Sequence, residues 1–303
     1  MSVGLTEADF LAAIDEIETS LALQQIALPW RPILAHFRFQ DRVGHELPYP
    51  PPDREAEQGA YDGEDLSIRI NRWYGRRYGS QLNEHLGPGR VAFTIHGGRW
   101  AMRLPGFVFP ARLHIYCGQQ PSDLVLDADA DHEETINVLN TIEDAPEALG
   151  NFISDVEKAR LVELFVLAYD ALERCSEHAD NALIQHALAD NDTAVHQLVS
   201  RSPSFGAAKW AALQAAEKAI KGFTQVRGGS YRAGHILQNL MPAAEAVGLP
   251  AETAKYFPSI QCDAGVRYGD QIVAETEAFD AHHASLAVMR VVGRALEGRV
   301  PAI

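Results

Sequence analysis

The stretch SPSFGAAKWAALQAAEKAIKGFTQV, residues 202–226, decides the class of fold. Its larger apolar side chains recur at three- and four-residue steps, the spacing that places them on one face of a helix. Pro203 stands near the start, where a helix tolerates proline, and Gly228-Gly229 follows the end, where glycine adopts the left-handed conformation without strain. The stretch predicts a helix that ends near Gln225 and carries the apolar stripe Trp210, Leu213, Ala216, Ile220 and Phe223.

The residues that follow have the same helical period. They predict a shorter helix over 235–247, a turn of helix near 251–256 and a long final helix over 271–297. Antiparallel helices of this kind bury their apolar stripes against one another as a bundle. We therefore expect residues 201–303 to form an all-α helical bundle, with His283 on a buried stripe as a hydrogen-bonded core or interface histidine.

The first 200 residues predict a different architecture. Thr6 and Asp9 suit the start of a helix over 6–26, and the prolines within 47–60 predict an extended connector, because proline removes a backbone donor. Apolar and polar residues then alternate in four short stretches, which predict strands over 66–70, 91–95, 100–104 and 113–117. Gly97-Gly98 suits a tight hairpin turn between two of these strands.

The predicted fold class is therefore α+β. We expect an acidic α+β domain over 1–140, in which one helix accompanies a small antiparallel sheet, a helical connector over 141–200 and the bundle over 201–303. Arg76-Arg77 would lie in a loop after the first strand, as a solvated pair or as a phosphate contact. Asp127, Asp129 and Asp131 resemble the start of a calcium loop that lacks its glycine and its final glutamate, so we predict no metal site.

Composition limits the classes of function. The chain has 303 residues, of which 47% are hydrophobic and 22% charged, as is ordinary for a globular protein. Its three cysteines lie far apart, which favours a reduced, cytoplasmic protein. The N-terminus lacks the basic region of a signal peptide, and no apolar run approaches the roughly 20 residues of a membrane span.

Charge is distributed unevenly along the chain. The net charge is −15, which disfavours general DNA binding because phosphate attraction requires a basic surface. Residues 201–303 hold 11 basic and 9 acidic residues, a balance of +2, whereas residues 1–200 hold 15 and 32, a balance of −17. The acidic first 200 residues are therefore a candidate surface for a protein partner.

Four segments of the C-terminal third resemble the HEPN domain, the higher-eukaryote-and-prokaryote nucleotide-binding family. They are AALQAAEKAIKGF (211–223), SYRAGHILQNLMPAAEAVG (230–248), VRYGD (266–270) and EAFDAHHASLAVMRVV (277–292). The resemblance covers about residues 202–298. It implies a basic residue on the first helix, a histidine at the head of the next and an Arg-Tyr pair before the last, where Lys218, His235 and Arg267-Tyr268 stand.

These residues and their neighbours suit an anionic ligand. Lys218 and Lys221 are three residues apart and share a helix face, and Arg232 and His235 flank a predicted helix start that favours an anion. Arg267 offers a bidentate guanidinium, while two tyrosines offer rings that stack on a base. The alternative is a solvated helix face and a capping histidine. The candidate ligand-binding residues are Lys218, Lys221, Tyr231, Arg232, His235, Arg267 and Tyr268.

Three functions remain open at this point. Ribonucleases of the HEPN family carry an arginine followed by a histidine after four to six residues, but only two residues separate Arg232 from His235. The first hypothesis is therefore a non-catalytic module, without a cofactor, that forms a homodimer and binds a nucleotide or another phosphate-bearing ligand. The second is a metal-independent ribonuclease in which Arg232 and His235 act. The third is a structural adaptor.

Overall fold

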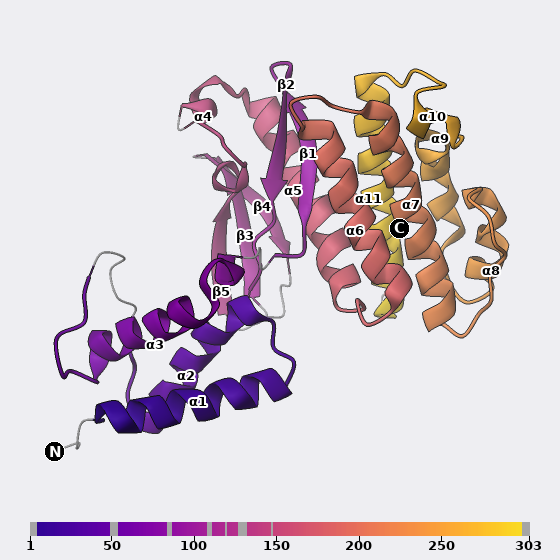
Figure 1. The fold of residues 1–303 in the computed structure, drawn as a ribbon. Helices are drawn as coiled ribbons and strands as arrows, with labels where there is room; N and C mark the ends of the chain where they lie inside the picture. Colours follow the sequence, from indigo (N-terminus) through magenta and orange to yellow (C-terminus); the bar gives the residue numbers. More distant parts are fainter. Residues whose placement is uncertain are drawn as a thin grey trace. The chain divides into compact units, whose positions relative to one another are not determined.

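A computed structural model of the chain describes residues 5–48, 54–83, 87–107, 111–118, 120–126, 132–146 and 148–298. The chain divides into two compact units, which we call the N-terminal unit (Met1–Leu86) and the C-terminal unit (Gly87–Ile303) (Figure 1). This division differs from the predicted boundaries at residues 140 and 200, because the strands share a core with the helices that follow them. Residues 49–53 of the predicted connector and the Asp127–Asp131 motif lie outside the described residues.

Helices and 3-10 turns make up the described part of the N-terminal unit. They are α1 (Glu7–Leu23), η1 (Leu28–Trp30), α2 (Arg31–Val43), α3 (Gly63–Tyr78) and η2 (Gly79–Asn83). The predicted first helix is confirmed, and it begins with a capping box in which Thr6 and Asp9 each accept a backbone N–H of the other. The unit has a core of its own, to which Phe10, Ile14 and Phe39 belong.

The predicted strand over 66–70 is wrong, because these residues lie in α3. Asp62 caps this helix by accepting a hydrogen bond from the N–H of Gly63 at 2.8 Å. Leu66, Ile70 and Tyr74 then follow at four-residue steps, and all three are buried. Five alternating residues are too short a run to distinguish a strand from a helix. The last turn of α3, and not a loop, holds Arg76-Arg77.

The strands of the C-terminal unit form two small sheets. The first pairs β1 (Arg90–Ile95) with β2 (Gly98–Arg103), and the second has the order β4 (Gln120–Leu126), β3 (Ala111–Cys117), β5 (His132–Asn137). Ile95 pairs with Gly98, so the hairpin turn is His96-Gly97, one residue before the predicted position. Both turn residues have positive φ, +50° and +73°, as the commonest two-residue hairpin turn requires.

The predicted α+β class is confirmed, although the sheets differ from the single one expected. The β1–β2 and β3–β4 pairs are antiparallel, whereas β5 runs parallel to β3. The four predicted strands also leave out β5, His132–Asn137. Parallel strands are not joined by a tight hairpin turn, so no turn motif in the sequence marks β5 as the neighbour of β3.

Four long helices form the bundle of the C-terminal unit. They are α5 (Asp155–Ser176), α6 (Ala182–Val199), α7 (Phe205–Val226) and α11 (Glu275–Leu296), and they follow η3 (Val138–Thr141) and the short α4 (Leu149–Phe152). The closest packing joins α6 to α7 and α11 to both α7 and α5. The bundle therefore begins at α5, and the predicted connector supplies two of its helices.

Short helical turns join α7 to α11. They are η4 (Leu237–Asn239), α8 (Met241–Glu245), η5 (Ala251–Tyr256), α9 (Phe257–Ile260) and α10 (Gly265–Tyr268). The predicted helix over 235–247 is wrong, because Ile236 is extended and regular helix starts only at Met241. Pro242 explains the late start, since a helix from His235 would place this proline in its interior and lose a backbone hydrogen bond.

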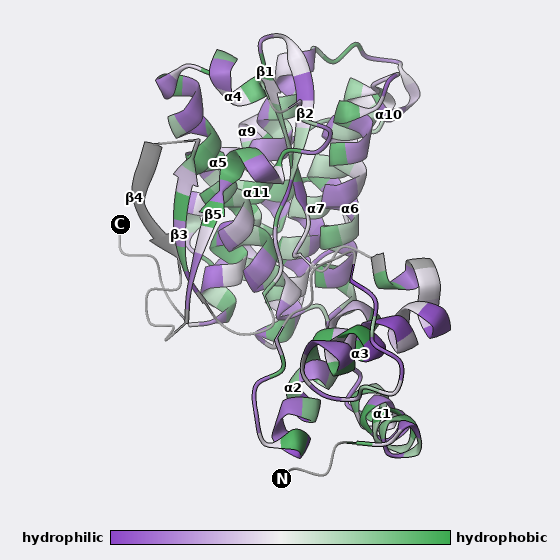
Figure 2. Cartoon of the chain, turned by 90° about the vertical axis from the view of Figure 1, so that its left-hand side faces the viewer, coloured by the Kyte–Doolittle hydropathy of each residue, from purple (hydrophilic) through white to green (hydrophobic). Residues whose placement is uncertain are grey.

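One hydrophobic core joins the sheets of the C-terminal unit to its bundle. Phe93 of β1, Leu113 of β3, Phe165 of α5, Phe223 of α7 and Met289 of α11 all belong to it. Figure 2 shows hydrophobic and hydrophilic residues alternating along the helices, as elements with one buried face require. In the part of the chain that the structure describes, no helix is long and apolar enough to cross a membrane.

Candidate functional site

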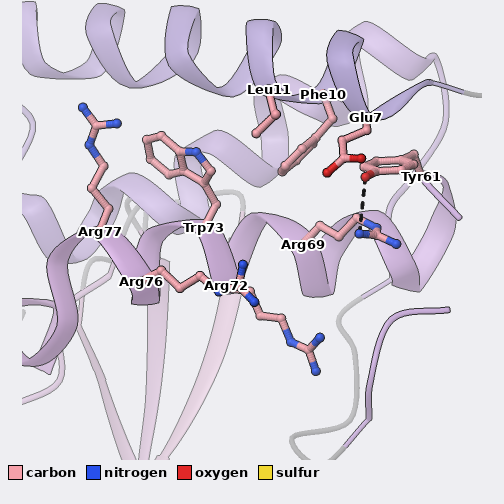
Figure 3. A pocket seen from close by; sticks show the side chains of 9 residues that line it. All are labelled: Glu7, Phe10, Leu11, Tyr61, Arg69, Arg72, Trp73, Arg76 and Arg77. Atoms are coloured by element: carbon pink, nitrogen blue, oxygen red, sulfur yellow. Dashed lines mark hydrogen bonds between the residues drawn. The ribbon is translucent and has the colours of Figure 1, made fainter. Parts of the chain in front are cut away.

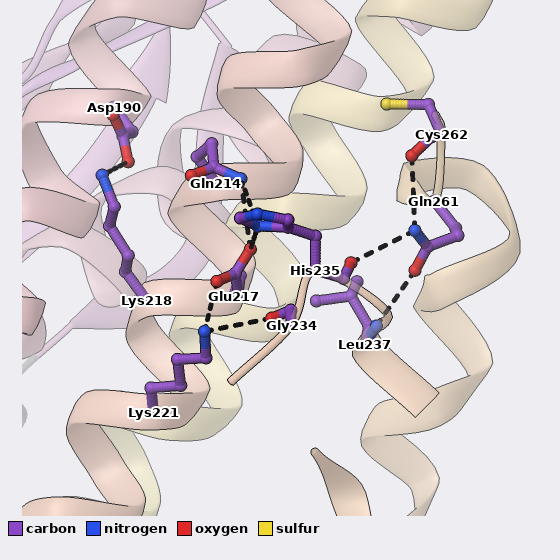
Figure 4. Close-up of polar contacts among 10 residues, drawn as sticks. All are labelled: Asp190, Gln214, Glu217, Lys218, Lys221, Gly234, His235, Leu237, Gln261 and Cys262. Carbon is purple, nitrogen blue, oxygen red and sulfur yellow. Dashed lines mark hydrogen bonds and ion pairs between the residues drawn. The ribbon is translucent and has the colours of Figure 1, made fainter. Parts of the chain in front are cut away.

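The candidate site lies where α7 meets the segment 230–237 that follows it. Gln214, Glu217, Lys218 and Lys221 stand at three- and four-residue steps on α7, so a single helix presents them all (Figure 4). His235 comes from the segment after the helix. Because α7 is held on both sides by α6 and α11, these side chains start from a rigid frame.

Glu217 is the centre of the cluster. It is only 3% exposed, yet its carboxylate accepts hydrogen bonds from Lys221 Nζ at 2.5 Å, from His235 Nδ1 at 2.7 Å and from Gln214 Nε2 at 3.1 Å (Figure 4). A buried carboxylate is stable only when it is paired and hydrogen-bonded, and these donors meet that need. The acceptor assigns the proton of the imidazole to Nδ1. Among the described residues Nε2 has no hydrogen-bond partner, and the side chain is 60% exposed.

Lys221 fixes the segment after α7 as well as the carboxylate. Its Nζ donates to the carbonyl oxygen of Gly234 at 3.0 Å and lies 5.5 Å from the centre of the Tyr231 ring. Gly234 has φ +143°, a conformation that side chains rarely adopt, so glycine is needed to turn this carbonyl toward the lysine. Lys221 therefore holds His235 in position through the backbone next to it.

Lys218 belongs to a different contact. Its Nζ lies 2.5 Å from Oδ2 of Asp190 on α6, and Figure 4 shows it reaching away from His235. Burial raises the pKa of the Asp190 carboxyl above its usual range, and the lysine opposes that shift. Both lysines predicted to bind an anion thus already have a carboxylate of their own chain. The predicted convergence of Lys218 and Lys221 on one ligand needs correction, since they face different acceptors.

Tyr231 and Arg232 lie on the same segment as His235. Both are exposed, and the described residues offer Arg232 no hydrogen-bond or ion-pair partner. The ring of Trp210 lies 5.6 Å from the imidazole of His235 and borders it. The exposed residues of the site are therefore His235, Arg232 and Tyr231.

Arg267 and Tyr268 lie on α10, apart from this cluster. Both are exposed, and the guanidinium of Arg267 lies 5.7 Å from the ring of Tyr268. α10 packs closely on the first turn of α7, where a Cβ on Gly206 would come within 2.1 Å of the carbonyl oxygen of Val266. Among the described contacts, none joins Arg267 or Tyr268 to His235 or to Glu217. The predicted single site of this pair with His235 is therefore not seen in the described contacts.

Sequence reasoning missed the acceptors of the cluster. Glu217 and Lys221 are four residues apart, so their pairing on one helix face was visible in the sequence as the favourable Glu-to-Lys order. An acidic residue within an alanine-rich, buried stretch was the available sign that Glu217 has a role. Asp190 carried no such sign, because its partner lies on another helix.

Two other histidines, on α11, form a structural contact. His282 Nε2 accepts the N–H of Ala92 on β1 at 3.1 Å, and His283 Nε2 donates to the carbonyl of the same residue at 2.8 Å. The prediction for His283, a hydrogen-bonded histidine at a packing interface, is confirmed. Burial lowers the pKa of both imidazoles, that of His282 well below its usual value. In the described ranges, no group of three His, Cys, Asp or Glu side chains is placed to hold a metal ion.

In comparisons with known proteins, the chain matches no protein family model, no curated protein and no solved structure. The resemblance to the HEPN family therefore rests on the quoted residues alone, and the function must be argued from the site.

Proposed function

We propose that the C-terminal unit is a HEPN-like, non-catalytic module that binds a nucleotide or another phosphate-bearing ligand at residues 230–236. One observation supports this above the others: buried Glu217 holds the imidazole of His235 by Nδ1, and this side chain is 60% exposed on the same segment as Arg232. A guanidinium and an imidazole both donate hydrogen bonds to phosphate oxygens. Tyr231, on the same segment, adds an exposed ring for a base.

In this proposal the two lysines have no direct contact with the ligand. Lys221 neutralises Glu217 and positions the segment, and Lys218 joins α7 to α6 through Asp190. Glu217 and Lys221 cancel each other's charge, so the guanidinium of Arg232 supplies the positive charge of the site. Phosphate binding is therefore expected to weaken as salt increases.

Calorimetric titration of the full-length protein with a panel of nucleoside mono- and triphosphates tests the proposal. We expect Arg232→Ala and His235→Ala to weaken binding about tenfold or more, because each removes a charge-assisted contact. Lys218→Ala is the matched control: it removes one positive charge from α7, close to the site, but should leave the affinity unchanged. Absence of binding heat across the panel, or equal losses in all three variants, would contradict the proposal.

The proposal includes a homodimer of the C-terminal unit. Large apolar side chains are exposed after α7, among them Ile236, Tyr268 and Ile272, and a second copy is the partner we propose for them. Sedimentation of the protein over a range of concentrations measures the association. Replacement of Ile272, which is 99% exposed, by aspartate should shift the protein toward the monomer without changing its helix content.

A ribonuclease is the second candidate, and the same histidine favours it. A carboxylate on Nδ1 at 2.7 Å orients an imidazole for general acid or base catalysis at Nε2, and Arg232 stands close enough in sequence to stabilise a phosphate in the transition state. This candidate predicts RNA cleavage by the purified protein that is lost in His235→Ala. RNA that stays intact during long incubation with the folded wild-type protein would dismiss it.

The third candidate, an adaptor that binds a protein through its acidic portion, now has a defined fragment for its test. The N-terminal unit ends at Leu86, so a protein that binds within residues 1–200 contacts either this unit or the sheets of the C-terminal unit. Binding of the partner to the full chain, measured with and without a competing fragment of the partner, distinguishes these two surfaces.

A further inference from the structure

A second candidate site lies within the N-terminal unit, on the outer face of α3. A cavity of about 330 Å³ opens there between α3 and α1 (Figure 3). Its charged lining consists of Arg69, Arg72, Arg76, Arg77 and Glu7. Four arginines against one glutamate leave an excess of three positive charges around a pocket in a strongly acidic protein.

The helix itself explains why these arginines gather. Arg69, Arg72 and Arg76 follow at three- and four-residue steps, so they share one face of α3. The opposite face carries Leu66 and Ile70, which are buried in the core of the unit. Packing of the apolar face in the core therefore leaves Arg72 and Arg76 at the surface, where they line the cavity.

No nearby carboxylate holds these guanidinium groups firmly. Arg69 donates to the carbonyl oxygens of Ala60 at 2.6 Å and Glu57 at 2.7 Å, so it is fixed in place while its charge is not neutralised. For Arg76 the described residues include no hydrogen-bond or ion-pair partner. The remaining two arginines, Arg72 and Arg77, have only loose ion pairs.

Arg72 lies 3.4 Å from Glu55, and Arg77 lies 3.5 Å from Asp15. The two carboxylates are 88% and 64% exposed, so water competes with each pair and the attraction is weak. A ligand with several negative charges can replace them at little cost. The guanidinium groups of Arg72, Arg76 and Arg77 are thus not committed to a buried carboxylate.

Aromatic rings complete the pocket. Trp73 stands between the arginines, and the guanidinium of Arg77 lies 4.8 Å from the centre of its ring. Tyr61 forms another wall, and its ring centre lies 5.7 Å from that of Phe10. The guanidinium carbon of Arg69 lies 4.1 Å from the centre of the Tyr61 ring. Planar guanidinium groups among aromatic rings suit a ligand that combines phosphate with a flat ring.

We propose that this pocket binds the phosphate groups of a small polyanionic ligand, either a nucleoside triphosphate or an inorganic polyphosphate. The cavity has the size of a small-molecule site. The N-terminal unit holds 8 arginines, no lysine and 14 acidic residues, a net charge of −6, which disfavours a long nucleic-acid strand beyond the pocket. The proposal is independent of the site at His235.

Titration calorimetry of the full-length protein with ATP and with tripolyphosphate tests it. The double variant Arg72→Ala/Arg76→Ala should weaken binding of both probes at least about tenfold, because two charge-assisted contacts are lost. Arg42→Ala is the matched control, since Arg42 is 41% exposed and pairs with exposed Glu16 much as Arg72 pairs with Glu55. ATP bound more tightly than tripolyphosphate, with the difference reduced in Trp73→Leu, would assign the ring of Trp73 to a base.

The outcomes separate this proposal from the one for the C-terminal unit. Binding that is lost in Arg72→Ala/Arg76→Ala and retained in Arg232→Ala supports the arginine pocket, whatever happens at His235. Binding that is retained in the double variant, or weakened equally by Arg42→Ala, overturns it. Failure of both probes to bind at millimolar concentration also overturns it.

Discussion

Protonation of His282 should destabilise the C-terminal unit at mildly acidic pH. The imidazole is 1% exposed, and its Nε2 accepts the N–H of Ala92 at 3.1 Å on the edge of β1 that β2 leaves open. An imidazolium has no lone pair to accept this bond. Burial holds the pKa of His282 well below 6.5, so the folded protein keeps the ring neutral where the unfolded chain binds a proton.

The size of the effect follows from this difference in proton binding. Above pH 6.5 both states are neutral at this residue, and the free energy of unfolding does not depend on its titration. Below pH 6.5 the unfolded state gains the proton first, so stability falls with decreasing pH by at most about 1.4 kcal/mol per pH unit until the lowered pKa is reached. At pH 5.5 the loss from His282 is therefore about 1.4 kcal/mol. Burial also lowers the pKa of His283, which adds a loss of the same sign.

Urea unfolding at pH 7.5 and pH 5.5, followed by circular dichroism, measures the slope. His282→Gln offers an amide oxygen to the N–H of Ala92 and does not titrate. Between pH 7.5 and pH 5.5 the free energy of unfolding of this variant should therefore fall by about 1.4 kcal/mol less than that of the wild type. His282→Ala leaves the N–H unsatisfied and should cost about 1–3 kcal/mol at both pH values. His196→Gln, an exposed histidine of α6, is the control. A slope in His282→Gln equal to that of the wild type would refute the reasoning.

Three further substitutions test contacts elsewhere. Glu217→Gln leaves buried Lys221 without its carboxylate and should lower the unfolding free energy by about 3 kcal/mol in urea; a change below 1 kcal/mol would show that the pair is dispensable. Asp62→Ala removes the cap of α3 and should cost about 1 kcal/mol in the thermal transition of the N-terminal unit, whereas the transition of the C-terminal unit should stay in place. Gly206→Ala brings a Cβ against the carbonyl of Val266 and should destabilise by about 1–3 kcal/mol; an unchanged melting temperature would contradict the close packing of α10.

The long elements could be predicted from the sequence because many residues agree on each of them. Over α7 and α11 the apolar stripe repeats through 22 residues in each helix, and α1 adds a capping box. The stretch 66–70 failed for the opposite reason, since five residues fit both periods. The residues that favour a helix, the cap Asp62 and the buried Tyr74, lie outside 66–70.

The partners of the elements and of the site residues could not be predicted, because they are set by packing between distant segments. Nothing in the local pattern of α5 or α6 shows that they, with α7 and α11, make the bundle. The same limit applies to Lys218, whose acceptor Asp190 is 28 residues away on another helix. Sequence spacing selects the basic groups as candidates, but it does not show the carboxylates that they meet.

Those carboxylates also decide which cations are available to a ligand. An anion that recruited Lys221 would have to leave buried Glu217 without its lysine, and breaking a buried pair costs about 3–5 kcal/mol. Recruitment of Lys218 would leave the partly buried carboxylate of Asp190 without its lysine. Recruitment of Arg72 or Arg77 only replaces an exposed carboxylate, whose pair is worth about 0–1 kcal/mol. Arg232 and Arg76 have no described partner to give up. A phosphate-bearing ligand at either site should therefore select arginines over the lysines of α7, and Lys218→Ala should change the stability of the protein and not its affinity.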